Sequence, residues 1–313
     1  MTRQLSPRSC RTRSAIPQKF TPMAPRLFLL SLLCRAASAV EEPPEGMVHV
    51  EGGGFHMGAI VVRSRDDLAQ QPVEVRGFLL DETTVTVDAF RAFRKATDYR
   101  TDAQKFGWSF VLELHATEEA LRITNSTVKD ASHWLAVPGA YWRLPQGPGS
   151  TVKGKEHYPA THVSFNDAKA YCKWAGKRLP SELEWESAAR GGLEDEPFPW
   201  GDREDDVHKR MNGWEGAFPD ENLAKDGFIG VAPVDEYAPN AFGVYNAVGN
   251  VWEWCAGGTP EKRPLRGGSF VDTVDGTHNH ALRCATRMDQ TADSGGHNTG
   301  FRCARDVSEE EEL

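Results

Sequence analysis

A chain of 313 residues, of which 39% are hydrophobic, is long enough for one large domain or two small ones. It can bury a substantial core without help from metals or oligomerisation. Its net charge of -9 argues against nucleic acid or an anionic membrane surface as a partner, because binding to phosphates depends on a basic surface.

The first 39 residues have the layout of a secretory signal segment. Arg26 precedes an apolar run at 27–34 that is too short to span a bilayer, and the small residues up to Ala39 predict cleavage after that position. We therefore expect a linker at 40–46, a folded domain at 47–305 and an acidic tail at 306–313. The protein is expected in the secretory pathway.

The hydrophobic periodicity and the capping residues of the sequence predict one strand and three helices. Residues 47–50 alternate like a strand, and a helix capped by Thr86 ends near Tyr99. A second amphipathic helix follows Ser164, and a third opens with a capping box at Ser181 and stops at a glycine pair. The helical residues expected in the core are Phe90, Phe93, Ala168, Tyr171, Cys172, Trp185, Ala188 and Ala189.

Long unpatterned segments separate these elements, above all residues 192–240, and a compact domain needs a special device such as metal ions or disulfides to hold them. Tryptophans are frequent between positions 174 and 254, and a tryptophan-rich core is a commoner explanation than a stacking groove for sugars or bases. These tryptophans are Trp174, Trp185, Trp200, Trp214, Trp252 and Trp254.

Four cysteines lie beyond the signal segment: Cys172, Cys255, Cys284 and Cys303. In an oxidising compartment an even number predicts disulfides, and the spacing does not choose among the three pairings that four cysteines allow. Asn125 begins an Asn-Ser-Thr sequence, which is an N-glycosylation acceptor in a secreted protein and an ordinary polar loop otherwise.

Two segments are rich in the oxygen ligands that calcium prefers. Asn246 and Glu253 lie within NAVGNVWEW, while Asp226 in KDGFIG follows Asn212 in the chain. Neither segment matches the EF-hand loop, so turn residues explain the same composition equally well.

Metal-ligating side chains also crowd the segment RGGSFVDTVDGTHNHALRC. His278 and His280, with Asp272 and Asp275, lack the helical spacing of a zinc site, and Ser269 lacks the Gly-x-Ser-x-Gly setting of a hydrolase nucleophile. By residue chemistry alone, this segment is a polar loop.

A series of motifs in fixed order resembles the formylglycine-generating, or sulfatase-modifying factor, family. The motifs are MVHVEGGGFHMG (47–58), VSFNDAKAYCKWAGKRLPSELEWESAARGG (163–192), FPWG (198–201), KDGFIGVAPV (225–234), FGVYNAVGNVWEW (242–254), RGGSF (266–270) and GFRC (300–303).

The resemblance implies a single irregular α/β domain, related to the C-type-lectin-like fold, with low regular secondary structure and two calcium ions. It assigns one ion to the side chains of Asn212 and Asp226 and the backbone of Gly213 and Phe228. It assigns the other ion to Asn246 and Glu253 with the backbone of Gly249 and Val251.

The resemblance also implies a Cys172–Cys303 disulfide. Cys284 loses its usual partner, because Ala189 stands at that position, and a Cys255–Cys284 bond is the weaker expectation.

Catalytic members of the family oxidise a cysteine in a Cys-x-Pro-x-Arg segment of sulfatases, with oxygen and a copper(I) ion held by two thiolates. The first thiolate lies three residues beyond the serine of the Arg-Gly-Gly-Ser motif, where this chain has Asp272. Ser269 is retained, but soft thiolates are what copper(I) selects. The loop is similar to that of a non-catalytic paralogue, so we expect a vestigial active site and no copper.

The expected function is that of a pseudoenzyme of the endoplasmic reticulum lumen that restrains formylglycine formation. It would bind the active enzyme or its sulfatase substrates, with a homodimer as a further assembly. The C-terminal Glu-Glu-Glu-Leu loosely resembles a retrieval sequence, and secretion is the alternative. Two other hypotheses are an oxidase that holds copper with Cys255 and Cys284, and a carbohydrate-binding module.

Overall fold

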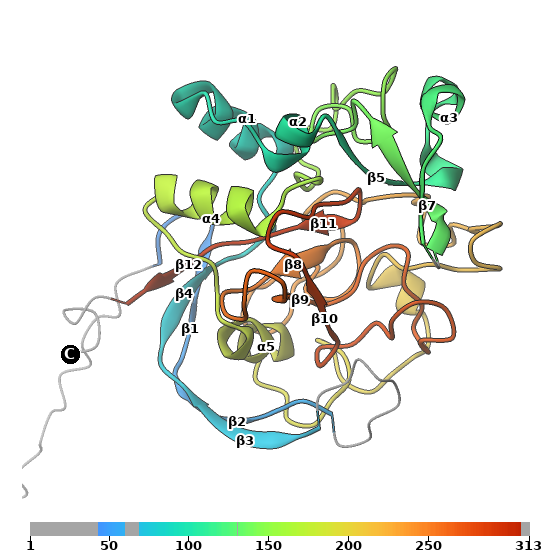
Figure 1. Ribbon diagram of the computed structural model, residues 1–313. Coiled ribbons are helices and arrows are strands. Elements are labelled where there is room, and N and C mark those ends of the chain that lie inside the picture. Colours follow the sequence, from blue (N-terminus) through green and yellow to red (C-terminus); the bar gives the residue numbers. More distant parts are fainter. Residues whose placement is uncertain (1–42, 60–68, 130, 308–313) are drawn as a thin grey trace, which may run out of the picture. The chain divides into compact units, whose positions relative to one another are not determined.

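The protein is described by a computed structural model that covers residues 43–59, 69–129 and 131–307 (Figure 1). The predicted signal segment at 1–39 and the last part of the acidic tail, 308–313, lie outside these residues. No helix in the described ranges has both the length and the hydrophobicity that crossing a membrane requires.

The first sheet joins the two ends of the domain. Its order is β1 (Met47–Val50), β4 (Phe78–Asp81) and β12 (Ala304–Asp306), and all its pairs are antiparallel. All of β4 is buried, as expected for a central strand, and Asp81 accepts a hydrogen bond from the backbone N–H of Cys303 at 2.9 Å.

The second sheet brings together the motifs that carry the family resemblance. Its order is β10 (Arg287–Gln290), β9 (Arg263–Arg266), β8 (Trp252–Trp254) and β11 (Thr299–Gly300), and only the β8–β11 pair is parallel (Figure 1). Glu253 is opposite Arg266 in this sheet, so the WEW and RGG motifs lie on adjacent strands.

Two smaller sheets complete the strands. A ribbon pairs β2 (Gly53–Met57) with β3 (Gln71–Val75), and a three-stranded sheet has the order β5 (Trp108–Leu112), β7 (Ala131–Pro138) and β6 (Thr127–Val128). Because β5 is at the edge of its sheet, one side of the strand is left for other contacts.

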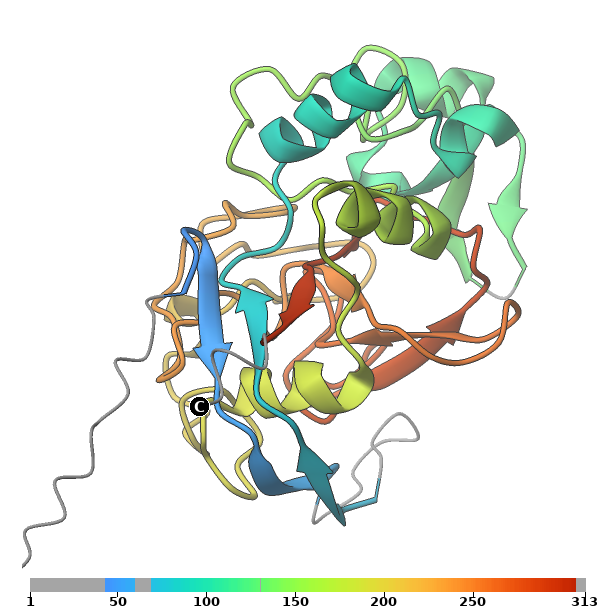
Figure 2. The same cartoon turned by 90° about the vertical axis from the view of Figure 1, so that its left-hand side faces the viewer.

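Three of the five α-helices in the described residues begin where the sequence predicts, and the two short ones between residues 102 and 123 were not predicted. The helices are α1 (Val87–Thr97), α2 (Asp102–Phe106), α3 (Glu118–Ile123), α4 (Phe165–Trp174) and α5 (Glu182–Arg190), with 3-10 turns η1 (Glu113–His115) and η2 (Val207–Lys209). Thr86 caps α1, and Ser164 and Ser181 form capping boxes on α4 and α5. α5 packs against β2, β3 and β9, while α4 packs against α1 (Figure 2).

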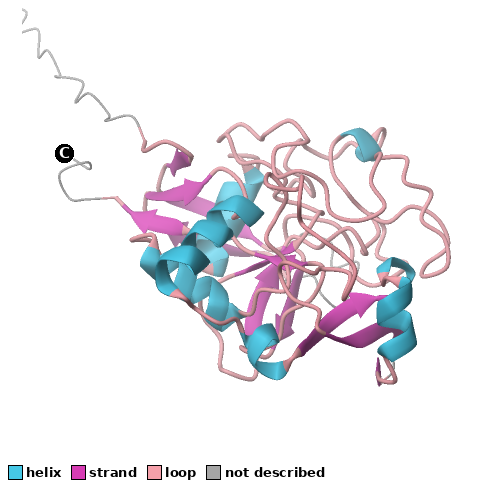
Figure 3. Ribbon diagram, turned by 90° about the horizontal axis from the view of Figure 1, so that it is seen from above, coloured by secondary structure: helices cyan, strands magenta, loops and turns pink. Residues whose placement is uncertain are grey.

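Irregular structure is extensive, in agreement with the expected low content of regular elements. Between α5 and β8 the chain forms only the short turn η2, and Figure 3 shows how much of the domain is loop. A disulfide joins Cys172 of α4 to Cys303 beside β12, with Cα atoms 5.7 Å apart, as the family resemblance implied. It closes a loop of 131 residues, which restricts the unfolded chain strongly.

Tryptophans fill much of the core, but not all of them do so. Trp185, Trp214, Trp252 and Trp254 are buried, whereas Trp174 is 44% exposed, so the core interpretation is wrong for that residue. Trp174 lies at the end of α4 and contacts the rings of Phe93 and Tyr171 from the outside.

Two buried ion clusters connect α5 to the second sheet. Arg302 binds both carboxylate oxygens of Glu253 at 2.7 Å, and Trp185 of α5 donates its indole N–H to the same carboxylate at 2.8 Å. Glu186 of α5 binds Arg190 and Arg266. Removing one partner of such a pair leaves an uncompensated buried charge, which costs about 3–5 kcal/mol.

Candidate functional site

The loop between β9 and β10 begins at Arg266, whose side chain is held in place by buried contacts. Arg266 is fully buried, is paired with Glu186, and donates to the carbonyl of Cys284 at 3.1 Å. Gly267 follows with φ 92°, and a Cβ atom there would lie 2.6 Å from the carbonyl oxygen of Ala247. The Arg-Gly-Gly sequence therefore anchors the loop and lets its backbone pass tightly over neighbouring segments.

Asp272 closes this loop on itself. Its Oδ2 accepts the backbone N–H and the hydroxyl of Ser269 at 2.8 and 2.7 Å, and its Oδ1 accepts the backbone N–H of His280 at 3.1 Å. Nδ1 of His280 is 3.0 Å from the same Oδ1. A carboxylate only accepts, so Nδ1 carries the proton in this contact. Four hydrogen bonds thus satisfy a carboxylate that is only 1% exposed.

A cavity of about 260 Å³ lies against this carboxylate. Phe110, Trp134, Trp252 and Trp254 supply its aromatic lining. The polar side chains along it include Asp272, His280 and Asn298. Asn298 donates to the Ser269 hydroxyl at 3.0 Å, and the His280 ring meets the Trp252 ring edge to face at 4.9 Å. The loop network therefore forms one wall of an aromatic cavity.

The side chains at this wall do not match the paired thiolates that the resemblance assigns to copper. They are a carboxylate, an imidazole, a hydroxyl and an amide, and the carboxylate already accepts from protein donors at both oxygens. These are hard or borderline donors, whereas copper(I) selects soft sulfur.

Cys255 and Cys284 are free thiols. The disulfide that the sequence analysis expected between them is therefore wrong for this structure. Each is fully buried against a different carbonyl: Cys255 Sγ is 3.8 Å from the carbonyl oxygen of Glu253, and Cys284 Sγ is 3.8 Å from that of Ala189. Burial raises the pKa of both thiols, that of Cys284 to about 12. A buried neutral thiol is neither a copper ligand nor a nucleophile.

In the first predicted calcium loop, the side chain of Asp226 contacts the backbone of the two residues predicted to bind the ion through their carbonyls. Asp226 accepts the backbone N–H groups of Phe228 at 2.9 Å and Gly213 at 3.3 Å, the two residues whose carbonyls the resemblance assigns to the ion. Burial raises the pKa of Asp226 to about 6.

The side chain of Asn212 is oriented by its amide nitrogen, which donates to the carbonyl of Gly230 at 2.8 Å. Its Oδ1 is buried and has no hydrogen-bond partner within the described residues. A buried amide oxygen without a partner costs free energy unless a cation or water satisfies it, and the partly buried carboxylate of Asp226 contacts the next residue, Gly213, so these residues fit a calcium ion.

The second predicted calcium loop also contains a buried amide oxygen without a hydrogen-bond partner among the described residues. Asn246 donates from its amide nitrogen to the carbonyls of Pro233 and Val234, both at 2.9 Å, and its Oδ1 is buried without a partner in the part of the chain described. The carboxylate of Glu253, in contrast, is bound by Arg302 and Trp185. The amide oxygen of Asn246 fits a cation, but the Glu253 charge is already paired.

The two loops touch through their backbones. Asn250 donates its N–H to the carbonyl of Asn212 at 2.8 Å, and a Cβ at Gly249 would lie 2.3 Å from that same oxygen. Gly249 has φ 80°, so both the contact and the conformation require glycine there. Val251 follows, fully within the core.

Three buried histidines near the site have no sequence pattern that would have revealed them. His115 Nδ1 is 3.4 Å from His297 Nε2, and the His115 ring stacks on Phe270 at 5.4 Å. His162 lies close to His297 and contacts the Ser109 hydroxyl. They come from distant parts of the chain, so spacing carries no information about them.

The remaining predicted residues lie at or near the surface, where Asp275 is exposed and His278 is partly buried. Asn125 is exposed in the segment between α3 and β6. Asp275 accepts from the Thr277 backbone at 3.0 Å, and the His278 ring stacks with Phe218 at 6.0 Å. Within the described ranges no three His, Cys, Asp or Glu side chains gather as a metal cluster.

Comparison with known proteins places this geometry in a family. The model of the sulfatase-modifying factor enzyme 1-like domain matches residues 35–307, so the chain belongs to that family.

Among its relatives are both inactive and active proteins. The inactive C-alpha-formylglycine-generating enzyme 2 of Bos taurus is 44% identical, over 90% of this chain and 95% of the relative. The formylglycine-generating enzyme of Thermomonospora curvata is 41% identical, over 85% of this chain and 95% of the relative. The solved structure of PvdO from Pseudomonas aeruginosa matches with a TM-score of 0.60 and 25% identity, covering 83% of this chain and 94% of that one.

The buried histidine His162 predicts a pH dependence of stability. Its Nε2 is 2.8 Å from the carbonyl of Pro145, and burial lowers its pKa to about 4. Between about pH 6.5, the pKa of an unfolded histidine, and pH 4 the unfolded chain binds more protons at this residue. The contribution of neutral His162 to stability is therefore complete above about pH 6.5 and is lost as the pH falls towards 4.

Substitution His162→Gln removes this titration while keeping an amide donor. We expect the stability advantage of the natural chain over the variant to shrink by about 1.4 kcal/mol per pH unit between pH 6.5 and 4. Urea unfolding at pH 7.5, 6 and 5 measures it. An advantage that stays constant over this range contradicts the assignment.

Proposed function

We propose that this protein is a non-catalytic member of the sulfatase-modifying factor family that restrains formylglycine formation. It does so by binding the formylglycine-generating enzyme or the sulfatase segments that this enzyme modifies. The observation that carries the proposal is Asp272, which occupies the position of a copper thiolate and accepts four hydrogen bonds from Ser269 and His280.

Overall similarity does not decide between a catalyst and an inactive relative. Identity is 44% to an inactive relative and 41% to a catalytic one, so the decision depends on the chemistry of one loop. A carboxylate with both oxygens engaged offers no soft donor, and the two free thiols are buried and neutral elsewhere in the core. These two facts favour the inactive alternative over an oxidase with rearranged cysteines.

The cavity beside Asp272 supports a binding role. Its aromatic walls include Trp252 and Trp254 on β8 and Trp134 on β7. A site of concave shape with aromatic walls and a few fixed polar groups is suited to hold a peptide side chain without transforming it.

Calcium and the compartment complete the proposal. We propose calcium ions at Asn212 and Asp226 and at Asn246, because both amide oxygens are buried without a partner among the described residues. The ions would satisfy these oxygens and fix the long loops around β8. The predicted signal segment supports a lumenal location in the endoplasmic reticulum, with the exposed Asn125 as a glycosylation site.

Calcium is predicted to stabilise the chain. At a free concentration of about 100 times the dissociation constant, one bound ion adds about 2.7 kcal/mol to the free energy of unfolding. We expect chelation to lower the melting temperature of the natural chain and to have a smaller effect on Asp226→Asn, with the exposed Asp202→Asn as matched control. Melting curves unaffected by calcium or chelator would contradict the proposed ions.

The functional proposal predicts no turnover. The purified full chain, incubated with a Cys-x-Pro-x-Arg peptide, copper and oxygen, is expected to form no aldehyde detectable by mass spectrometry, while the mouse formylglycine-generating enzyme forms it under the same conditions. Added in excess, the chain is expected to slow that enzyme.

Trp134→Ala should weaken binding to the peptide or the enzyme by roughly tenfold, or about 1.4 kcal/mol, and Trp174→Ala should not.

Two results would overturn the proposal. One is aldehyde formation by the full chain itself. The other is the absence of binding to both the enzyme and the peptide in calorimetry, which would leave the family member without the restraining role.

A further inference from the structure

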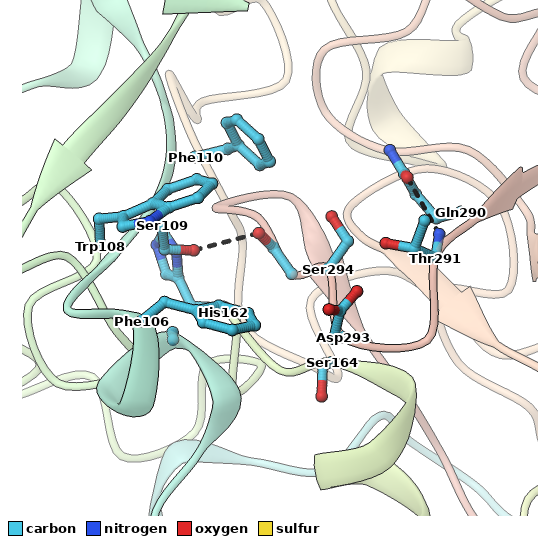
Figure 4. Close-up of a pocket in the computed structure, with 12 residues that line it drawn as sticks. Phe106, Trp108, Ser109, Phe110, His162, Ser164, Gln290, Thr291, Asp293 and Ser294 are labelled. Atoms are coloured by element: carbon cyan, nitrogen blue, oxygen red, sulfur yellow. Dashed lines mark hydrogen bonds between the residues drawn. The ribbon is translucent and has the colours of Figure 1, made fainter. Parts of the chain in front are cut away.

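The hollow that Figure 4 shows lies between β5 and the turn before β11. It shares Phe110, Ser294 and Gly295 with the cavity at Asp272, so it belongs to the site already described. Another cavity, of about 480 Å³, has no lining residue in common with either of them. We call it the lysine cavity, because Lys155 is the one Lys or Arg side chain in its described lining.

Separate parts of the chain form the walls of the lysine cavity, and backbone hydrogen bonds fix them. The lining residues come from the start of α1, from η1, from the segments 145–161 and 227–231, and from the turn that contains His297. The Val87 N–H donates to the carbonyl of Tyr158 at 2.8 Å, and the Thr117 N–H donates to that of Gln146 at 3.1 Å. The cavity is therefore preformed, and its volume is within the range of small-molecule sites, about 300–1,000 Å³.

Two buried imidazoles belong to this lining and lack part of their hydrogen bonds. His115 is 7% exposed and His297 is 4% exposed. Neither Nε2 of His115 nor Nδ1 of His297 has a hydrogen-bond partner within the described residues. Because buried polar atoms are normally paired, these two nitrogens indicate an occupant with polar groups.

A proton count shows what this pair of rings offers. Nδ1 of His115 is 3.4 Å from Nε2 of His297, and burial lowers the pKa of both rings, that of His115 to about 4, so both are neutral near pH 7. Each neutral ring carries one proton, and one of the two protons lies in the contact between the rings. The other proton must be on one of the two unpartnered nitrogens, so the pair offers a hydrogen-bond donor in either tautomeric state.

The Lys155 ammonium adds a positive charge to the same space. Its nitrogen is 5.5 Å from the centre of the Tyr158 ring. After burial, the charge of Lys155 is a further cause of the low pKa of His115, and it contributes to the low pKa of His297 as well. An anionic group bound here would meet both a cation and an N–H donor, a combination that makes strong hydrogen bonds.

No carboxylate of the described lining opposes an anion. Two acidic residues that neighbour the walls in the sequence are bound elsewhere. The carboxylate of Glu156 is 3.8 Å from the Arg91 guanidinium, and Asp226 accepts the N–H groups of Gly213 and Phe228. The charge inside the cavity is thus positive although the net charge of the chain is -9, which favours an anionic ligand over a cationic one.

The rest of the lining is largely apolar. Leu114 and Ile229 are 47% and 60% exposed, and Val152 and Val231 line the same cavity. Exposed apolar side chains gathered around a cavity are typical of a binding site. The ligand therefore needs an apolar body beside its charged group.

Gly230 leaves an edge of the His115 ring uncovered. A Cβ atom at this position would lie 3.6 Å from Nδ1 and Cε1 of His115, an ordinary contact distance. The backbone of Gly230 is outside the positive-φ region, so the chain conformation does not require glycine there. A methyl group at residue 230 would therefore occupy ligand space without straining the fold.

We propose that the lysine cavity binds a small organic anion that carries one carboxylate or sulfate-ester group on an apolar body. Lys155 pairs with the oxyanion, the imidazole pair donates an N–H to it, and Leu114 and Ile229 cover the apolar part. One lysine balances one negative charge, so a phosphate dianion is disfavoured. This binding is separate from the proposed restraint of formylglycine formation and does not depend on it.

Isothermal titration calorimetry of the purified full chain tests the class of ligand. The probes are octanoate, octyl sulfate, octanamide and acetate, in a buffer with calcium because Asp226 and Phe228 belong to the first predicted calcium loop. Octanoate or octyl sulfate is expected to bind at least tenfold more tightly than neutral octanamide. Acetate, which lacks the apolar body, is expected to bind more weakly than the better of these two anions, and that anion identifies the oxyanion group.

Variants of the walls test the position of the ligand. Lys155→Met keeps the apolar stem, removes the charge and is expected to weaken binding of the better anion by at least tenfold. Gly230→Ala should weaken it several-fold. Lys153→Met, which changes an exposed lysine outside the lining, should leave the affinity unchanged. Circular dichroism confirms that each variant is folded.

Three results would overturn the inference: no binding of either anion, equally tight binding of octanamide, or unchanged affinity in Lys155→Met. Nitrogen-15 NMR of the imidazoles adds a measurement on the natural chain. The better anion is expected to shift the signals of His115 and His297, and unchanged signals contradict the proposed location. Because the enzyme and peptide assays use Trp134→Ala, outside this cavity, failure here leaves the proposed function untouched, and the reverse also holds.

Discussion

The carboxylate of Asp272 holds the two sides of the loop between β9 and β10 together. It receives the backbone and hydroxyl of Ser269 on one oxygen and the backbone and ring of His280 on the other. A charged acceptor with several donors is among the stronger contacts that a buried site can make. The shape of the aromatic cavity follows from it, because Asn298 is fixed through Ser269 and the His280 ring is fixed against Trp252.

Buried ion pairs hold in place the segments on which the hydrogen bonds of Asp272 depend. Arg266 starts the loop and is paired with Glu186 of α5, while Arg302 pairs with Glu253 of β8. Arg302 also donates to the carbonyls of Glu82 and Tyr245, so one side chain connects the end of β4, the segment before the second predicted calcium loop, and β8 of the second sheet. The motifs that identify the family are therefore largely motifs of these buried ion pairs. An active and an inactive member can share them, which is why the proposed loss of catalysis rests on the loop and not on overall similarity.

Local chemistry made part of this structure predictable. Caps at Thr86, Ser164 and Ser181 involve residues three positions apart, so the sequence alone reveals them. The His115–His297 contact spans 182 residues, and no spacing rule reaches so far.

Tertiary contacts also determine the burial and pairing of several side chains that the sequence pattern could not predict. The expectation of a Cys255–Cys284 bond took Cys255 as the remaining candidate because Ala189 stands at the usual partner position of Cys284, whereas each thiol is buried against its own carbonyl. Trp174 was expected in the core as one of the tryptophans between positions 174 and 254, but it lies at the exposed end of α4. The four donors to Asp272 depend on an irregular turn that brings His280 back to it, which residue type alone does not specify.

We propose that the loop at Asp272 provides no soft donors for monovalent copper. Copper(I) affinity can be measured by anaerobic competition between the full chain and the chelator bicinchoninate, with the mouse formylglycine-generating enzyme measured alongside. We expect the chain to leave the copper with the chelator under conditions in which the mouse enzyme withdraws it. Tight binding of one copper(I) ion per chain that disappears in His280→Ala or in Cys255→Ser would contradict the proposed inactivity.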